Sequence, residues 1–271
     1  MKSISKQKWI SLSVEVNEKN KINFLYTNFH GDIIGTFEHD GHLIFYFDYK
    51  LKQSINTICN HNFIINDIDY ENWHQGYEQY FKPIKIDDKM IVVPDWHNSD
   101  DKSIDYIKIK PGMAFGTGSH ETTQLILSTL KNHISQSGHI LDLGSGSGIL
   151  AIGAFKYGAS YVTCYEYDQD CEENFFENMK LNNISNNYKL LFDDVLSIKN
   201  FKYDCILANI NKNIILQLLP NMKKFRSNKC KIILSGLLLS DQEEVIKLIN
   251  QLNFKLLESF VKGEWICLII E

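Results

Sequence analysis

Ile140-Leu141-Asp142-Leu143-Gly144-Ser145-Gly146-Ser147-Gly148-Ile149-Leu150 is the stretch that decides the fold class of this chain. Its first residues are apolar, three glycines follow at alternate positions, and an amphipathic helical pattern begins at Ile149. Gly144 and Gly146 allow the backbone to approach a ligand closely, and the free N–H groups of a helix N-terminus attract an anionic group such as a carboxylate. The stretch therefore predicts a strand, a ligand-binding loop and a helix.

The spacing of these glycines narrows the class of ligand. A dinucleotide-binding loop requires a third glycine or an alanine at position 149, where this chain has Ile149. The G-x-G-x-G pattern fits an adenosyl amino acid better than a pyrophosphate. Strand-to-helix turns also use glycine for purely steric reasons, so the loop indicates a ligand site only together with the residues that follow it.

Strand and helix patterns alternate on both sides of this loop. Strands are predicted at 139–143, 161–166, 188–192, 203–208 and 231–235, and helices at 121–132, 149–156, 170–181, 213–224 and 241–251. Alternating strands and helices predict an α/β fold, a doubly wound, Rossmann-like parallel sheet covered by helices. Two final strands, 256–261 and 265–270, are close enough in sequence to pair antiparallel. Ser240 and Glu243 form a capping-box pattern at the start of the last helix.

The first 82 residues predict a separate small unit. Strand patterns at 9–16, 32–38, 43–47 and 63–68 alternate with helical patterns at 20–28 and 51–59, and Asp40-Gly41 marks a hairpin between the second and third strands. This is the order β-α-β-β-α-β of a ferredoxin-like α+β domain. A length of 271 residues accommodates this second domain. We predict a small α+β domain over 1–68, a connecting segment over 69–99 and the α/β domain over 100–271.

Two polar residues follow predicted strands of the sheet. Glu166 lies 22 residues past Gly144, where an α/β nucleotide site places the carboxylate that accepts the ribose hydroxyls. Asn209 follows the strand 203–208, so it is expected at the same edge of the sheet, although an Asn also commonly begins a turn. Asp168 is assigned to capping the helix that begins near Asp170.

A second glycine-rich segment precedes the ligand-binding strand. Residues 111–123 read P-G-M-A-F-G-T-G-S-H-E-T-T and open a predicted helix, which brings hydroxyl groups and backbone donors toward the site. His120 is a candidate general base, but a histidine in the first turn of a helix is more often a capping or packing residue.

Composition excludes several classes of protein. The chain carries 28 basic and 33 acidic residues, and Arg226 is its single arginine, so direct binding to nucleic acid is not expected. The six cysteines include no C-x-x-C pair, which argues against a zinc site or a disulfide framework. No stretch approaches the length of a membrane span or the apolar core of a signal peptide, so we expect a cytoplasmic protein.

With these segments in order, the chain resembles class I S-adenosylmethionine-dependent methyltransferases, and among them the family that methylates ribosomal protein L-eleven (L11). The resemblance runs from about Trp73 to the end of the chain. It is carried by Trp73 with residues 80–85 (Y-F-K-P-I-K), 92–96 (V-V-P-D-W), 111–123, 141–153, 165–168 (Y-E-Y-D), 208–210 (A-N-I) and 234–236 (L-S-G). The pattern F-G-T-G-x-H-x-T-T at 115–123 is far more specific than the glycine loop.

The resemblance implies S-adenosylmethionine as cofactor and assigns its contacts to Thr123, Gly144, Glu166 and Asn209, to which the loop analysis adds Gly146. The family usually has Asp at the ribose position, and Glu166 keeps the carboxylate one methylene further out. No metal is implied. The small N-terminal domain, shorter than usual for the family, is implied to recognise the substrate.

The implied function is protein N-methylation of lysine or N-terminal amines of ribosomal protein L11, with Asn209 as the catalytic residue that orients the amine. The alternatives are a methyltransferase for another protein, a glutamine amide or a nucleobase, and a ribosome-assembly factor that binds without turnover. Amide and nucleobase enzymes typically have an N/D-P-P-Y motif, whereas Asn209 is followed here by Ile210-Asn211-Lys212.

Overall fold

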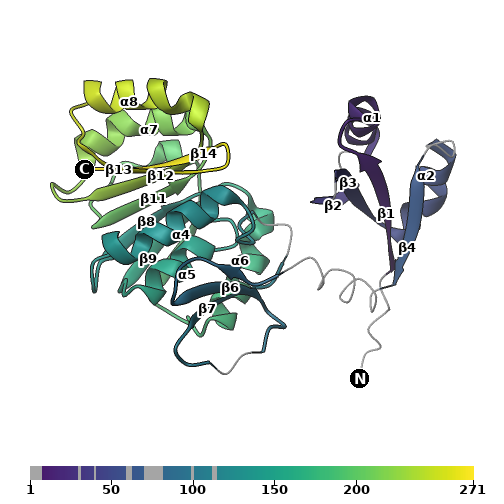
Figure 1. Ribbon diagram of the computed structural model, residues 1–271, viewed down its shortest axis with the longest axis horizontal. Coiled ribbons are helices and arrows are strands. Elements are labelled where there is room, and N and C mark those ends of the chain that lie inside the picture. Colours follow the sequence, from purple (N-terminus) through teal and green to yellow (C-terminus); the bar gives the residue numbers. More distant parts are fainter. Residues whose placement is uncertain are drawn as a thin grey trace. The chain divides into compact units, whose positions relative to one another are not determined.

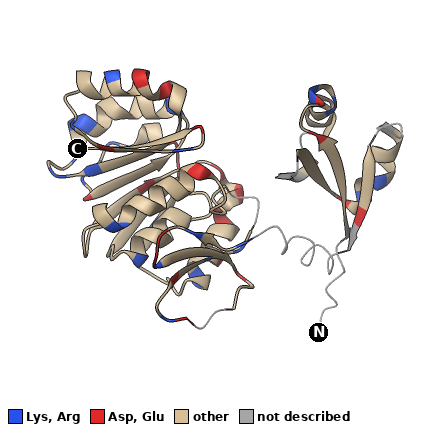
Figure 2. Ribbon diagram, in the orientation of Figure 1, with Lys and Arg blue, Asp and Glu red and all other residues tan. Residues whose placement is uncertain are grey.

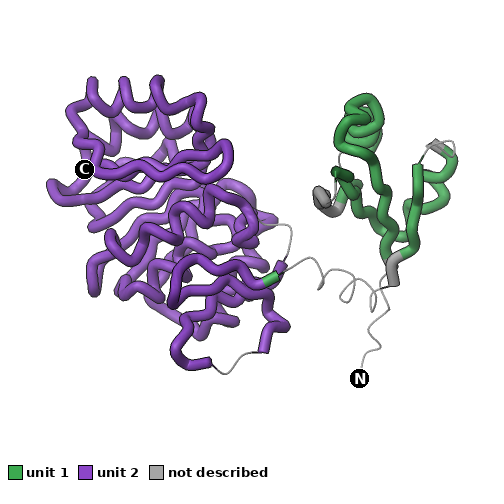
Figure 3. The backbone as a smooth tube through the Cα atoms, in the orientation of Figure 1, with its two compact units in different colours: residues 1–82 green, residues 83–271 purple. Residues whose placement is uncertain are grey.

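The computed structural model describes residues 8–29, 32–39, 41–58, 63–69, 82–98, 101–111 and 115–271. The chain divides into two compact units, residues 1–82 and residues 83–271 (Figure 3).

The first unit is a four-stranded antiparallel sheet with two helices. Its elements are β1 (Lys8–Glu15), α1 (Lys19–Phe29), β2 (Ile33–His39), β3 (His42–Asp48), the short turn η1 (Tyr49–Leu51), α2 (Lys52–Ile58) and β4 (Ile64–Asp69). The strand order is β2-β3-β1-β4. Ile10, Leu12 and Val14 alternate along β1 and are buried, because successive side chains of a strand point to opposite faces. These elements follow the order β-α-β-β-α-β.

The second unit is built on a seven-stranded sheet with the order β10-β9-β8-β11-β12-β14-β13 (Figure 1). The strands are β8 (His139–Leu143), β9 (Tyr161–Glu166), β10 (Tyr188–Phe192), β11 (Cys205–Asn209), β12 (Lys231–Leu238), β13 (Leu256–Lys262) and β14 (Trp265–Ile270). The pairs among β8–β12 are parallel, and β14 pairs antiparallel with both β12 and β13. The predicted doubly wound sheet with an antiparallel C-terminal strand is therefore confirmed.

Helices cover both faces of this sheet. One apolar core includes residues of α4 (Glu121–His133), α5 (Ile149–Lys156) and α6 (Glu172–Leu181), and the other includes residues of α7 (Lys212–Phe225) and α8 (Gln242–Gln251). Neighbouring residues of β11 belong to opposite cores: Leu207 to the first, Ile206 and Ala208 to the second. A strand buried on both faces needs a continuous apolar run, which is why 205–208 reads C-I-L-A.

A small three-stranded sheet precedes α4 and was not predicted. It consists of β5 (Ile84–Lys85), β6 (Met90–Pro94) and β7 (Asp105–Ile109) in the order β5-β6-β7. Part of the predicted connecting segment 69–99 thus belongs to the second unit, because β6 pairs with β7 across the predicted boundary at 99/100. Residues 70–81 lie outside the described residues.

The predicted capping box of the last helix is wrong. A 3-10 turn, η4 (Leu239–Asp241), precedes α8, and Ser240 lies inside this turn. The Asp241 carboxylate accepts the N–H of Leu238 at 3.0 Å instead. The cause is the earlier start of the helical backbone, which moves the unpaired N–H groups upstream of Ser240.

Basic and acidic residues are interspersed over the helices of the second unit (Figure 2). In the described part of the chain, no helix combines the length and apolarity needed to cross a bilayer.

Candidate active site

The glycine loop joins β8 to α5 where the strand order of the sheet reverses. The chain proceeds from β8 outward to β9 and β10, and then returns to β11 on the other side of β8. Such a switch point is where open α/β sheets bind ligands, beyond the carboxyl ends of the strands.

Steric contacts explain why this loop requires glycine. Gly144, Gly146 and Gly148 have φ angles of 74°, 50° and 81°, values that favour glycine. A Cβ atom on Gly144 would lie 2.5 Å from Cγ2 of Ile210, and one on Gly146 would clash with the carbonyl oxygen of Phe115. The loop is therefore packed tightly between the segments that follow β11 and precede α4.

Glu166 ends β9 and binds the glycine loop directly. Its Oε2 accepts the N–H of Gly146 at 2.8 Å, and its Oε1 accepts the N–H groups of Tyr167 at 2.8 Å and Asp168 at 3.0 Å. An ionised carboxylate offers about four acceptor positions, so Oε2 retains capacity for a ligand hydroxyl. Asp168 accepts the N–H of Asp170 at 3.0 Å and caps η2 (Gln169–Cys171), which confirms its predicted capping role.

Asn209 and Thr123 meet although 86 residues separate them. Asn209 is the last residue of β11, and because Ala208 pairs with Leu143 of β8, Asn209 lies beside Gly144. Its Nδ2 donates to Oγ1 of Thr123, a fully buried residue in the first turn of α4, at 3.4 Å. With Nδ2 held in this way, Oδ1 is the acceptor that the amide offers to an incoming N–H group.

The segment before α4 closes over the glycine loop. The N–H of Ser147 donates to the carbonyl of Phe115 at 2.9 Å, and the Ser147 hydroxyl donates to the carbonyl of Gly116 at 2.6 Å. The Phe115 side chain is 55% exposed. Since Ser147 itself is buried, the two glycine-rich segments form one packed unit.

His120 caps α4. Its Nδ1 accepts the N–H of Thr122 at 3.3 Å, and its ring packs between Phe115 and Trp265, with centroid distances of 5.5 and 4.8 Å. A neutral imidazole whose Nδ1 is an acceptor carries its proton on Nε2, so Nε2 has no lone pair for a substrate proton. The geometry favours the capping and packing role over that of a general base.

A buried carboxylate lies beneath the loop. Asp142 of β8 is fully buried, and no hydrogen bond of full geometry reaches its two carboxylate oxygens among the described residues, although the N–H of Ala151 and the hydroxyl of Ser145 lie near enough to lower its pKa. Burial, and then the negative charge of Glu166, raise the pKa of Asp142 to about 7. Burial thus favours the protonated, uncharged form of Asp142.

Sequence analysis did not single out Asp142 or Tyr167 as site residues. The signal for Asp142 was present, because a carboxylate within a strand buried on both faces needs a specific explanation. Tyr167 follows Glu166 directly and is 80% exposed at the same edge of the sheet, but an aromatic residue at a strand end carries no distinctive pattern.

The third component that sequence analysis missed is the packing around Ile210. Gly236, in β12, has a φ angle of 80°, and a Cβ atom there would clash with the carbonyl oxygen of Ile210. Ile210 is thus enclosed by Gly144 on one side and Gly236 on the other. This packing fixes the backbone directly after Asn209.

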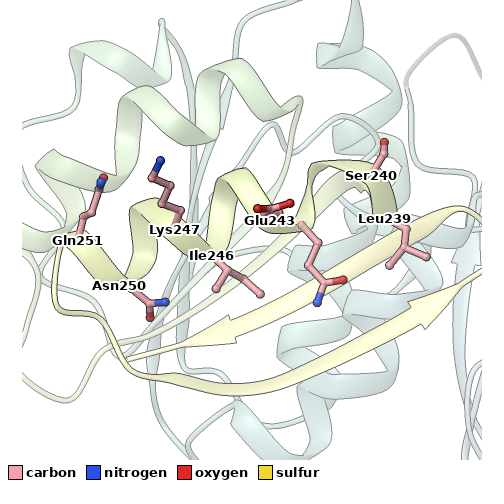
Figure 4. A pocket seen from close by; sticks show the side chains of 8 residues that line it. Leu239, Ser240, Glu243, Ile246, Lys247, Asn250 and Gln251 are labelled. Carbon is pink, nitrogen blue, oxygen red and sulfur yellow. The ribbon is translucent and has the colours of Figure 1, made fainter.

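An open groove of about 790 Å³ runs along α8, lined by Leu239, Ile246 and polar residues (Figure 4). None of the predicted site residues lines this groove. The candidate active site is instead the cluster around the glycine loop.

A family profile, a curated relative and a solved structure all match most of this chain, and all three are L11 methyltransferases. The sequence profile described as "Ribosomal protein L11 methyltransferase (PrmA)" matches residues 9–271. A "Ribosomal protein L11 methyltransferase" of Thermoanaerobacter pseudethanolicus is 34% identical over 218 residues, which are 80% of this chain and 70% of that protein. The crystal structure of a ribosomal protein L11 methylase from Lactobacillus delbrueckii subsp. bulgaricus is similar with a TM-score of 0.65 and 29% identity, over 70% of this chain and 98% of that one.

Proposed function

Because the chain belongs to the ribosomal protein L11 methyltransferase (PrmA) family, we propose that it transfers methyl groups from S-adenosylmethionine to amine nitrogens of ribosomal protein L11. One observation carries the proposal: Gly144, Glu166 and the Thr123–Asn209 pair converge at the switch point of the sheet. They lie within a match that spans nearly the whole chain.

The charge at the glycine loop supports this choice of cofactor. S-adenosylmethionine supplies a methyl group on a positively charged sulfonium, together with an α-ammonium group. The carboxylate of Glu166 provides complementary negative charge, and a cation bound near Asp142 would favour the ionised form of that buried carboxyl group. The N-terminus of α5, which begins at Ile149 directly after the glycine loop, suits the cofactor's carboxylate. Glu166 would bind the ribose through Oε2.

Asn209 is the residue that we assign to the amine. A nucleophilic amine must be uncharged, and it must present its lone pair to the methyl carbon. Oδ1 of Asn209 accepts an N–H of the amine and so fixes the direction of the lone pair. Positioning of this kind supplies most of the rate, since it replaces a random encounter by an aligned one. Exclusion of water favours the neutral amine, so that water suffices to carry away the proton.

Both lysine and N-terminal amines satisfy this geometry, and we assign both as substrates. The first unit is assigned to capture of the substrate protein. Residues 1–82 contain eight Lys and ten Asp or Glu, so they are mildly acidic, which suits a basic ribosomal protein. A substrate-recognition domain over 1–68 and a cytoplasmic location belong to the same proposal.

Mass spectrometry of purified ribosomal protein L11, incubated with the enzyme and S-adenosylmethionine, tests the proposal. The expected result is addition of methyl groups at lysine or at the N-terminal amine, located by fragmentation. Asn209→Ala serves as the matched control, and it should show little modification. If L11 stays unmodified while another protein or an RNA gains methyl groups, the substrate assignment is wrong. If the cofactor binds and no substrate is modified, the chain is a binding factor.

A further inference from the structure

Two asparagines of α6 and Asn182, the residue directly after it, bind the backbone at the end of β7 and directly after this strand. Asn182 accepts the N–H of Lys108 at 2.9 Å and donates to its carbonyl at 2.7 Å. One helical turn earlier, Asn178 accepts the N–H of Lys110 at 2.8 Å, and Asn174 donates to the carbonyl of Lys110 at 3.0 Å. Because β6 pairs with the opposite edge of β7, these amides occupy the place of a further strand.

This arrangement works because two spacings match. Residues four apart on a helix are separated by about 6 Å along its axis, at 1.5 Å per residue. Residues two apart on a strand, whose N–H and C=O groups point to the same side, are separated by about 6.6 Å. Asn182 and Asn178, four positions apart, therefore meet Lys108 and Lys110, two positions apart, while Asn174 binds the carbonyl of Lys110 as well.

Asn178 makes one contact that its two neighbours do not. Its Nδ2 donates to the carbonyl of Ser147, in the glycine loop, at 2.9 Å, and the side chain is fully buried. The same helix packs against the loop through Phe175, whose ring lies 2.9 Å from where a Cβ atom on Gly148 would stand. Asn178 thus joins β7, which leads into the segment before α4, to the loop that we assign to the cofactor.

We infer that Asn178 is a positioning residue for the cofactor site: it sets the glycine loop against the segment that follows β7. The N–H and the hydroxyl of Ser147 donate to the carbonyls of Phe115 and Gly116, and Asn178 binds the third polar group of Ser147, its carbonyl. Without the Asn178 amide, this buried carbonyl loses its donor and the loop loses its attachment to α6. Asn182 binds β7 in the same manner without touching the loop, so it has a structural role only.

The test compares Asn178→Ala with Asn182→Ala in the full chain. Calorimetry with S-adenosylmethionine should show a dissociation constant about tenfold higher for Asn178→Ala, and one within twofold of wild type for Asn182→Ala. Thermal unfolding should show a lower Tm for both variants. With L11 as substrate, Asn178→Ala should raise KM for the cofactor by a similar factor and leave kcat at saturation within about threefold. Asn178→Ser, which leaves a smaller void, replaces Asn178→Ala if the latter fails to fold.

This inference rests on the proposed function, and a second measurement separates the two. Amide hydrogen exchange of the cofactor-free proteins should be faster at 144–148 in the Asn178 variant and unchanged there in Asn182→Ala. Equal effects of both variants on affinity, or equal exchange at 144–148, would overturn the positioning role. If wild type itself binds no S-adenosylmethionine, the proposed function fails, and the exchange experiment still decides the role of Asn178.

Discussion

Replacement of Glu166 by Gln tests the ribose-binding assignment most directly. The carboxylate binds three backbone N–H groups in the structure, one through Oε2 and two through Oε1. A glutamine amide has a single oxygen, so either Gly146 or the Tyr167–Asp168 pair must face an NH₂ group. The variant therefore loses both the charge at the ribose and part of the attachment of the glycine loop.

The expected loss in cofactor affinity follows from these bonds. Hydrogen bonds to charged groups contribute about 1.5–3 kcal/mol, which corresponds to a dissociation constant about one to two decades higher for S-adenosylmethionine. Glu166 is half-buried, so the lost contact with Gly146 should cost the free protein only about 1 kcal/mol, or about 2–4 °C in Tm. Glu166→Asp should cost less cofactor affinity than Glu166→Gln, because it keeps the charge.

Isothermal titration of wild type and both variants with S-adenosylmethionine and S-adenosylhomocysteine provides the measurement. Thermal unfolding of the same samples reports the contribution of the loop contact. An unchanged affinity of Glu166→Gln for both ligands would refute the ribose assignment. A lower Tm with unchanged affinity would show that Glu166 only holds the loop.

Four further outcomes are expected. Asn209→Ala should lower kcat for L11 methylation more than cofactor affinity, measured by initial rates and calorimetry; a weak binder with normal saturated turnover would make Asn209 a cofactor contact only. A chain that begins at Pro83 should bind S-adenosylmethionine with native affinity but lose methylation of L11, and full activity would remove the docking role of the first unit. Gly236→Ala should lower the Tm and kcat together, since its Cβ would displace the Ile210 carbonyl beside Asn209; a native Tm and rate would contradict that packing. The raised pKa of Asp142, about 7 against an ordinary 3.8, means that the folded state retains a proton that the unfolded state releases. The free energy of unfolding therefore falls as pH rises from about 4 to 7. Denaturant titrations should show that wild type loses roughly 2–4 kcal/mol more than Asp142→Asn across this range. Equal pH dependence of the unfolding free energy in both proteins would exclude the effect.

The parallel sheet was predictable from sequence because its strands are buried on both faces. Continuous apolar runs such as 205–208, separated by amphipathic helices, leave little choice of architecture. The positions of Glu166 and Asn209 followed from the same logic, since the carboxyl ends of parallel strands share one edge of the sheet. Their contacts with the loop and with Thr123 could not be deduced, because they depend on how segments that are distant in sequence pack against one another.

The three-stranded sheet before α4 could not be recognised for a physical reason. β5 has two residues and β6 ends in a proline, so neither presents a usable alternating pattern. The backbone of Lys108 and Lys110, at the end of β7 and directly after it, is bound by asparagine side chains 64 to 74 residues further along the chain. A run of asparagines on a helix ordinarily indicates a solvated face, and only the tertiary structure shows its partner.

The order of strands at the far end of the sheet has a consequence for biosynthesis. β14 is made after β13 but lies between β12 and β13. While the ribosome is still producing β14, β12 therefore presents an unpaired edge, and β13 has no neighbour in the described part of the sheet to receive it. Exposed edges of this kind invite pairing between nascent chains. The turn at Gly263, whose φ angle of 57° favours glycine, must form before β14 can enter this place. A substitution that slows the turn should thus appear first as aggregation during translation, in protein that is fully active once folded.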